Sequence, residues 1–182
     1  MNLCSFTIAA TFVAATLVPV QTAIAGTADE LRENAQAALN SLYAKNPGAK
    51  AIGKKAVAAP VFPGIVKAGL GVGGQYGEGV LFKGGKAAGY YNTAGASIGL
   101  QAGAQQYGYA LFFLSDETLK TLDQAQGFEI GVGPSVVIAD EGMAKTTTTT
   151  TVQDKIYAFI FDQKGAMAAL GLQGNKITKI KK

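Results

Sequence analysis

The chain has 182 residues, and its 16 Lys and Arg against 12 Asp and Glu give a formal net charge of +4. It has no His and no Trp, and its single cysteine, Cys4, stands near the start. These counts argue against Ser-His-Asp and Cys-His catalysis and against the usual zinc and copper ligands. So modest a charge, without a nucleic-acid motif, also argues against a nucleic-acid binder. We expect no enzyme, no cofactor and no bound metal.

The first 25 residues have the pattern of a secretory signal peptide. An uncharged, mostly apolar run from Leu3 to Val20 precedes Ala23-Ile24-Ala25, a small-x-small cleavage site. We expect cleavage between Ala25 and Gly26, which leaves residues 26–182 as one exported domain. A retained membrane anchor is the alternative, but the apolar run is short for a membrane span.

Two helices are predicted before the first strand. Thr27 is followed three residues later by Glu30, a capping-box pattern, and apolar residues then recur at helical spacing over residues 27–44. A shorter helix is expected over 49–57. Pro60 and Pro63 then end the helical pattern, and a turn is expected at Pro60-Val61-Phe62-Pro63.

Glycines two residues apart mark the segment 63–81. Positions 69, 71 and 73, and then 77 and 79, fall on one face of an extended segment, because side chains alternate along a strand. Such a face permits close approach of another backbone, a helix or a ligand, or strong bending of the sheet. Gly69, Gly71 and Gly74 formally match G-x-G-x-x-G, but helix-forming residues do not follow, so we interpret the segment as a strand.

The remainder of the chain is predicted to be mostly β, with one helix that begins at the cap Ser115 and ends near Gln126. A glycine series at 95, 99 and 103 would also suit a close-packed membrane helix, but the neighbouring glutamines favour a strand. The pattern predicts an α+β fold: a β-rich, strongly curved, mainly antiparallel glycine-rich sheet with N-terminal helices and one inserted helix. The predicted strands are 69–83, 87–94, 96–104, 107–114, 127–139, 155–163, 166–172 and 175–180, with Gly84-Gly85 as a turn and the threonine tract 146–151 as an exposed strand or a polar loop.

Carboxylates are the main candidates left for chemistry. Glu78 and Glu129 could form an acid–base pair, but a charge in an alternating strand is more often on the solvent face. Asp140-Glu141-Gly142 could touch calcium, but it lacks the spacing of a calcium loop and is better interpreted as a turn. We predict no catalytic residue and no metal ligand.

Four segments together resemble the SYLF-domain family: VFPGIVKAGLGVGGQYGEGVL, YYNTAGASIGLQAGAQQYGYALFFLSDETL, FEIGVGPSVVIAD and AFIFDQKGAMAALGLQGNKITKI. The resemblance runs from about Asn34 to Ile180, over nearly all of residues 26–182. It implies a β-rich domain with N-terminal helices and lipid binding in the eukaryotic members, whose basic amphipathic N-terminal segment is held responsible. Bacterial members resemble envelope proteins, which implies a place in the periplasm or at the outer membrane. In this chain the first helix is acidic, at Asp29, Glu30 and Glu33.

We therefore expect a non-enzymatic, exported, envelope-associated protein that binds anionic phospholipid; a structural or adhesive envelope protein is the alternative. Lys50, Lys54 and Lys55 would share one broad helical face, and Phe62 beside them could dip into lipid headgroups. Lys67 follows on the glycine-rich strand and completes the candidate lipid-binding set. The alternative interpretation of this lysine cluster is a solvated face beside a core turn.

Overall fold

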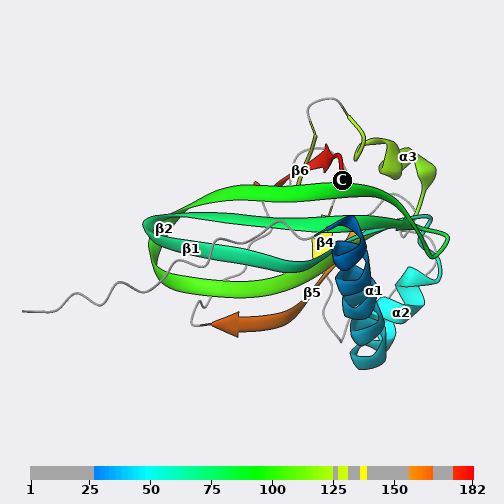
Figure 1. Ribbon diagram of the computed structural model, residues 1–182, viewed down its shortest axis with the longest axis horizontal. Helices are drawn as coiled ribbons and strands as arrows, with labels where there is room; N and C mark the ends of the chain where they lie inside the picture. The colour runs from blue at the N-terminus through cyan, green and yellow to red at the C-terminus, as the bar shows by residue number, and fades with distance from the viewer. Residues whose placement is uncertain (1–26, 125–126, 131–135, 139–155, 166–173) are drawn as a thin grey trace, which may run out of the picture.

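The computed structural model describes residues 27–124, 127–130, 136–138, 156–165 and 174–182 (Figure 1). The predicted signal peptide, with its cleavage site at Ala25 and Gly26, lies outside the described residues. So do Asp140-Glu141-Gly142, the threonine tract and the strand predicted at 166–172.

Two N-terminal helices are present, as predicted. Helix α1 spans Ala28–Lys45, and Thr27 caps it: the Thr27 hydroxyl accepts from Glu30 N at 3.2 Å, while Thr27 N donates to Glu30 Oε2 at 2.9 Å. This pair confirms the capping box. Helix α2 spans Pro47–Gly53 and is shorter than predicted. Asn46 caps it through a bond from Ala49 N at 2.9 Å, so proline takes the first helical position, where it needs no donor.

A long antiparallel hairpin follows. Strand β1 spans Ala59–Lys83 and strand β2 spans Lys86–Phe113, so three strands predicted separately are one. The predicted turn at Gly84 and Gly85 is confirmed, with φ of 57° and 77°. The helical pattern does end before Pro60, but the turn predicted at Pro60-Val61-Phe62-Pro63 is wrong, because these residues belong to β1. Among the described strands β1 pairs only with β2, so its other edge needs no donors and tolerates proline.

Both long strands bend sharply near their middles. Leu70 pairs with Ala102 and Val72 with Ile98, so three residues of β2 face a single residue of β1 there. Beyond the bend the second half of β1 lies against its first half, and a Cβ added at Gly77 would be 2.8 Å from the carbonyl oxygen of Gly64. Close backbone approach and strong bending, both expected of the glycine face, are confirmed.

The other strands complete one six-stranded sheet in the order β3-β6-β2-β5-β4, with β1 on β2. The first half of β2 pairs with β6 and its second half with β5, all antiparallel, whereas β4 runs parallel to β5. Because β1 and β2 are bent double, the sheet curls on itself (Figure 1). The predicted α+β class with a curved, mainly antiparallel sheet is confirmed. The short strands are β3 (Phe128–Glu129), β4 (Val136–Ile138), β5 (Ile156–Gly165) and β6 (Lys176–Ile180).

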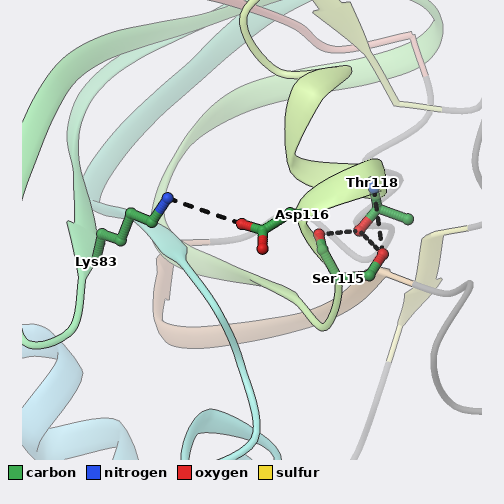
Figure 2. Close-up of polar contacts among 4 residues, drawn as sticks. All are labelled: Lys83, Ser115, Asp116 and Thr118. Atoms are coloured by element: carbon green, nitrogen blue, oxygen red, sulfur yellow. Dashed lines mark hydrogen bonds and ion pairs between the residues drawn. The ribbon is translucent and has the colours of Figure 1, made fainter.

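The inserted helix α3 spans Asp116–Lys120, and its predicted cap is confirmed by the bond from Thr118 N to the Ser115 hydroxyl at 3.2 Å. Figure 2 shows this cap beside an ion pair of 3.7 Å between Lys83 and Asp116. The pair joins the end of β1 to the start of α3. Both side chains are more than half exposed, so we expect it to contribute little stability.

The curled sheet separates two apolar cores. The inner core fills the sheet and includes Phe62, Ile65, Tyr91, Tyr109 and Leu111. The second core lies between the outer face of the sheet and helices α1 and α2, and it includes Leu31, Leu39, Val61, Phe112 and Phe159. The strand residues of the second core stand at the end of the hairpin remote from the bend. The second core thus does not extend to the bend, where none of the described helices packs on the outer face.

Candidate functional site

The predicted lipid-binding residues do not form one surface. Lys50, Lys54 and Lys55 are exposed on and just after α2, and among the described residues none of them forms an ion pair. Phe62 is fully buried in the inner core and Lys67 is only 4% exposed. A patch with Phe62 and Lys67 at the surface is therefore wrong, because the bend turns this face of β1 inward. A lipid role of the α2 lysines stays a prediction.

Exposed apolar side chains gather instead around the bend. In the described part of the chain the large exposed apolar side chains are Val66, Val72 and Tyr76, at 51%, 67% and 50% exposure. All three belong to β1 and lie within eleven consecutive positions, 66–76. Single exposed apolar residues are ordinary on protein surfaces, but a local group on an uncovered face is typical of a contact surface.

A groove of about 800 Å³ begins beside this group and runs under α1. Val66 and Tyr76 border it, and Leu31 of α1 contributes to the opposite wall. Its two carboxylates are both paired: Lys182 Nζ lies 2.6 Å from Glu78 Oε2, and Lys45 Nζ lies 3.0 Å from Asp162 Oδ1. The paired lysines offset the negative charge of the groove.

Lysines flank the exposed apolar group on the same outer surface. Val66 pairs with Gln106, which pairs with Lys164. Directly paired residues share a face of a sheet, and all three side chains are exposed. Lys164 therefore stands two strand spacings, roughly 10 Å, from Val66.

A second lysine is placed in the same way on the side of the sheet where β6 lies. Tyr76 pairs with Ala94, which pairs with Lys176, and these three side chains are exposed as well. Glu129 is the next residue in that row. We name the bend patch the set Val66, Val72, Tyr76, Lys164 and Lys176. Sequence reasoning missed it because the lysines are far along the chain from β1, and only strand pairing places them together.

The interior behind the bend patch is polar. The Tyr107 hydroxyl donates to Gln75 Oε1 at 2.7 Å, and the Gln75 amide donates to Asn175 Oδ1. Lys67 pairs with Gln105, and both side chains are 4% exposed. Burial raises the pKa of Tyr107 to about 12, so this hydroxyl stays neutral at physiological pH.

A family model described as Ysc84, Las17-binding protein actin regulator, matches residues 94–182. Residues 94–182 belong to the SYLF-domain family. The resemblance found in the sequence is thus confirmed for this part of the chain. A search of the curated proteins gives no match.

The SYLF-domain match contains part of the surface and part of the interior just described. It includes Lys164 and Lys176 of the bend patch, and Gln105, Tyr107 and Asn175 of the polar interior. Helices α1 and α2 and the whole of β1 precede it. The apolar half of the bend patch therefore comes from outside the matched residues.

The carboxylates considered for catalysis are far apart. Tyr76 and Glu129 occupy the same row of the sheet, with β2 and β6 between them, and Glu78 is two positions beyond Tyr76. Three strand spacings correspond to roughly 14 Å, which exceeds the separation in glycosidase carboxylate pairs. Within the described ranges, no acidic cluster could hold a metal ion, and no helix is both long and apolar enough to cross a membrane.

Proposed function

We propose that this SYLF-domain protein is a non-enzymatic lipid-binding protein that, once exported, attaches to anionic phospholipid of the cell envelope. The bend patch is the observation that carries the proposal. It presents Val66, Val72 and Tyr76 to solvent, since none of the described helices buries them, and it has Lys164 and Lys176 at its sides.

The two parts of the patch supply the two terms that peripheral membrane binding needs. Burying a valine or an aromatic side chain completely is worth about 1.5–3 kcal/mol, and partial insertion gives a fraction of that. Each lysine near an anionic surface adds about 1 kcal/mol. Tyr76 suits the interface because its ring is apolar and its hydroxyl is polar. Together these terms favour reversible attachment rather than insertion.

The signal peptide predicted from the sequence supports the choice of a lipid partner. The family description names Las17 binding and actin regulation. A chain whose first 25 residues direct it to the periplasm or the outer membrane would meet neither of those partners, but it would meet phospholipid surfaces. The alternative is a structural or adhesive envelope protein, in which the bend patch would contact a protein instead of a lipid.

Vesicle co-sedimentation of residues 26–182 tests the proposal. Neutral phosphatidylcholine vesicles are compared with vesicles that also contain phosphatidylglycerol. The triple variant Val66→Ser, Val72→Ser, Tyr76→Ser should bind the anionic vesicles at least about tenfold more weakly, because it removes more than 1.4 kcal/mol of apolar transfer.

The matched control is Ala87→Ser, Ala88→Ser. These residues are also exposed on the hairpin, but they stand at its turn, away from the bend. The control should bind like the unchanged protein. Equal binding by the triple variant, with an unchanged circular dichroism spectrum, would show that the bend patch is not the membrane-contact surface.

A further inference from the structure

Three polar side chains are buried together inside the curled sheet. Lys67 and Gln105 are each 4% exposed and Asn175 is 1% exposed. Lys67 and Gln105 are direct cross-strand partners, so their Cβ atoms lie about 5 Å apart on the inner face. Asn175 joins the same group through Gln75 and the Tyr107 hydroxyl, two residues along β2 from Gln105. We name Lys67, Gln105 and Asn175 the inner polar cluster.

The inner polar cluster contains polar groups that the described protein does not satisfy. Gln105 Oε1 and Asn175 Nδ2 are buried without a hydrogen-bond partner. Within the described part of the chain, Lys67 forms no ion pair and no hydrogen bond. Buried polar groups in folded proteins are nearly always paired, and an unpaired buried charge is more costly still. Three such groups in one place indicate a binding site rather than a packing accident.

The cluster lies directly behind the bend, where the strands offer a side-chain-free boundary. The pair Lys67–Gln105 is two residues from the pair Gly69–Gly103, and Gln75 pairs with Gly95 on the returning half. A Cβ added at Gly103 would meet no atom within 4 Å, whereas a Cβ added at its partner Gly69 would lie 2.7 Å from the carbonyl oxygen of Val72. The bend is therefore open beside Gly103 and closed by backbone beside Gly69. The Gly103 side is thus the side from which a small ligand would approach the cluster.

We propose that the inner polar cluster binds a phosphate group that carries at most one ester bond, either as free inorganic phosphate or as the phosphate monoester headgroup of a phospholipid. The Lys67 ammonium and the Asn175 amide are donors that suit phosphate oxygens, and bonds to an ionised acceptor are the stronger kind. Gln105 Oε1 needs a donor, which the remaining P–OH of a singly ionised phosphate monoester supplies. A carboxylate has acceptors only and leaves Gln105 unsatisfied.

The bend patch makes the lipid source the more favourable one. Lys67 is inside the sheet, while its neighbour Val66 is exposed on the outside. A phosphate site and an apolar surface thus meet at one strand, which matches the two parts of a phospholipid. The phosphate site itself does not depend on membrane attachment, so the two proposals can fail separately.

Thermal unfolding in phosphate and in chloride buffers of equal ionic strength tests the site. The unchanged protein and the exposed-lysine control Lys86→Met should both gain several degrees in Tm with phosphate, because a ligand that binds only the folded state stabilises it. Lys67→Met should show no phosphate-dependent gain. In chloride its Tm should equal or exceed that of the unchanged protein, since methionine fills a similar volume without an unpaired charge.

A second variant covers the case in which Lys67→Met does not fold. Asn175→Asp keeps the shape of the side chain but removes the amide donor and adds a carboxylate to the inner polar cluster, which should abolish the phosphate-dependent gain by repelling the anion. Calorimetric titration of the unchanged protein with inorganic phosphate should show one site. A simple alternative is that Lys67 rotates to bond Gln105 and serves structure only. In that case Lys67→Met lowers Tm and phosphate changes nothing, which would overturn the proposal.

The source of the phosphate is separated by titration with short-chain lipids below their micelle concentrations. Dihexanoyl phosphatidic acid is a phosphate monoester, and dihexanoyl phosphatidylcholine is the diester control. Binding of phosphatidic acid that is lost in Lys67→Met supports a lipid ligand. Binding of inorganic phosphate alone supports a free anion. Binding of neither, or equal binding of the two lipids, eliminates the site.

Discussion

Gly77 in the second half of β1 lies directly against Ile65 in the first half, so that a Cβ at position 77 would be 2.6 Å from Ile65 Cγ1. Two positions later the relation repeats: a Cβ at Gly79 would be 2.5 Å from the carbonyl oxygen of Val61. The strand thus packs against itself through glycine. Any larger residue would have to displace backbone, which a packed sheet resists.

Replacement of Gly77 or Gly79 by alanine should destabilise the fold by about 1–3 kcal/mol, the usual cost of overpacking. Urea unfolding followed by circular dichroism measures this as a lower midpoint with an unchanged slope. Gly74→Ala is the matched control, because its added Cβ would have only the Gly95 carbonyl oxygen nearby, at 3.9 Å. Midpoints equal to that of the control would mean that the two halves of β1 do not meet in solution.

We expect the two groups of surface lysines to contribute differently to membrane binding. Lys50, Lys54 and Lys55 belong to the end of the hairpin that is eleven β1 residues, roughly 35 Å, from the bend. Ile52 and Phe62 are buried, so we expect these three lysines to attract a membrane through their charge alone. Losing three lysines at an anionic surface costs about two decades of affinity at most, and the effect should vanish at high salt.

Reversal of Lys164 and Lys176 to glutamate should instead weaken binding to anionic vesicles by about tenfold or more. A combination with the Val66, Val72 and Tyr76 substitutions should be non-additive, because these residues contact the same membrane patch. Co-sedimentation of all variants at two salt concentrations gives the comparison. Loss of binding only on reversal of Lys50, Lys54 and Lys55 would place the membrane at the helical end.

Stability should fall at alkaline pH. Burial raises the pKa of Tyr107 to about 12, and it also raises the pKa of Tyr91 and Tyr109, whereas an unfolded tyrosine ionises near pH 10. The folded state therefore holds these protons more tightly, so their contribution is complete below about pH 10 and is lost as the pH rises beyond it. Urea midpoints that decrease above about pH 10 would confirm this. Tyr107→Phe should show a shallower decrease, and identical pH dependence would contradict the assignment to Tyr107.

The remaining prediction concerns cleavage of the signal peptide. If Ala23-Ile24-Ala25 is the cleavage site, protein recovered from the cell envelope should begin at Gly26. Intact-mass measurement of the recovered chain gives the answer directly. A full-length N-terminus on exported protein would favour a retained anchor instead.

The sequence alone determined the local features correctly. The capping box at Thr27, the turn at Gly84 and the cap at Ser115 each depend on residues within a few positions of one another. The glycine period likewise predicted a face open to close approach. The turn predicted at Pro60 and Pro63 was wrong. Proline disfavours a strand that is paired on both edges, and the sequence did not reveal that one edge of β1 has no described partner.

Which residues share a surface was decided only by the tertiary structure. In the sequence, Lys67 has the pattern of an ordinary strand lysine. In the structure, the bend turns its side chain inward beside Gln105 and leaves Val66 outside. Lys164 and Lys176 join the apolar residues of β1 only because β5 and β6 pair with different halves of β2. A period of two predicts which residues alternate but not which side faces solvent. That choice depends on where the strand bends and on which segments then cover each face.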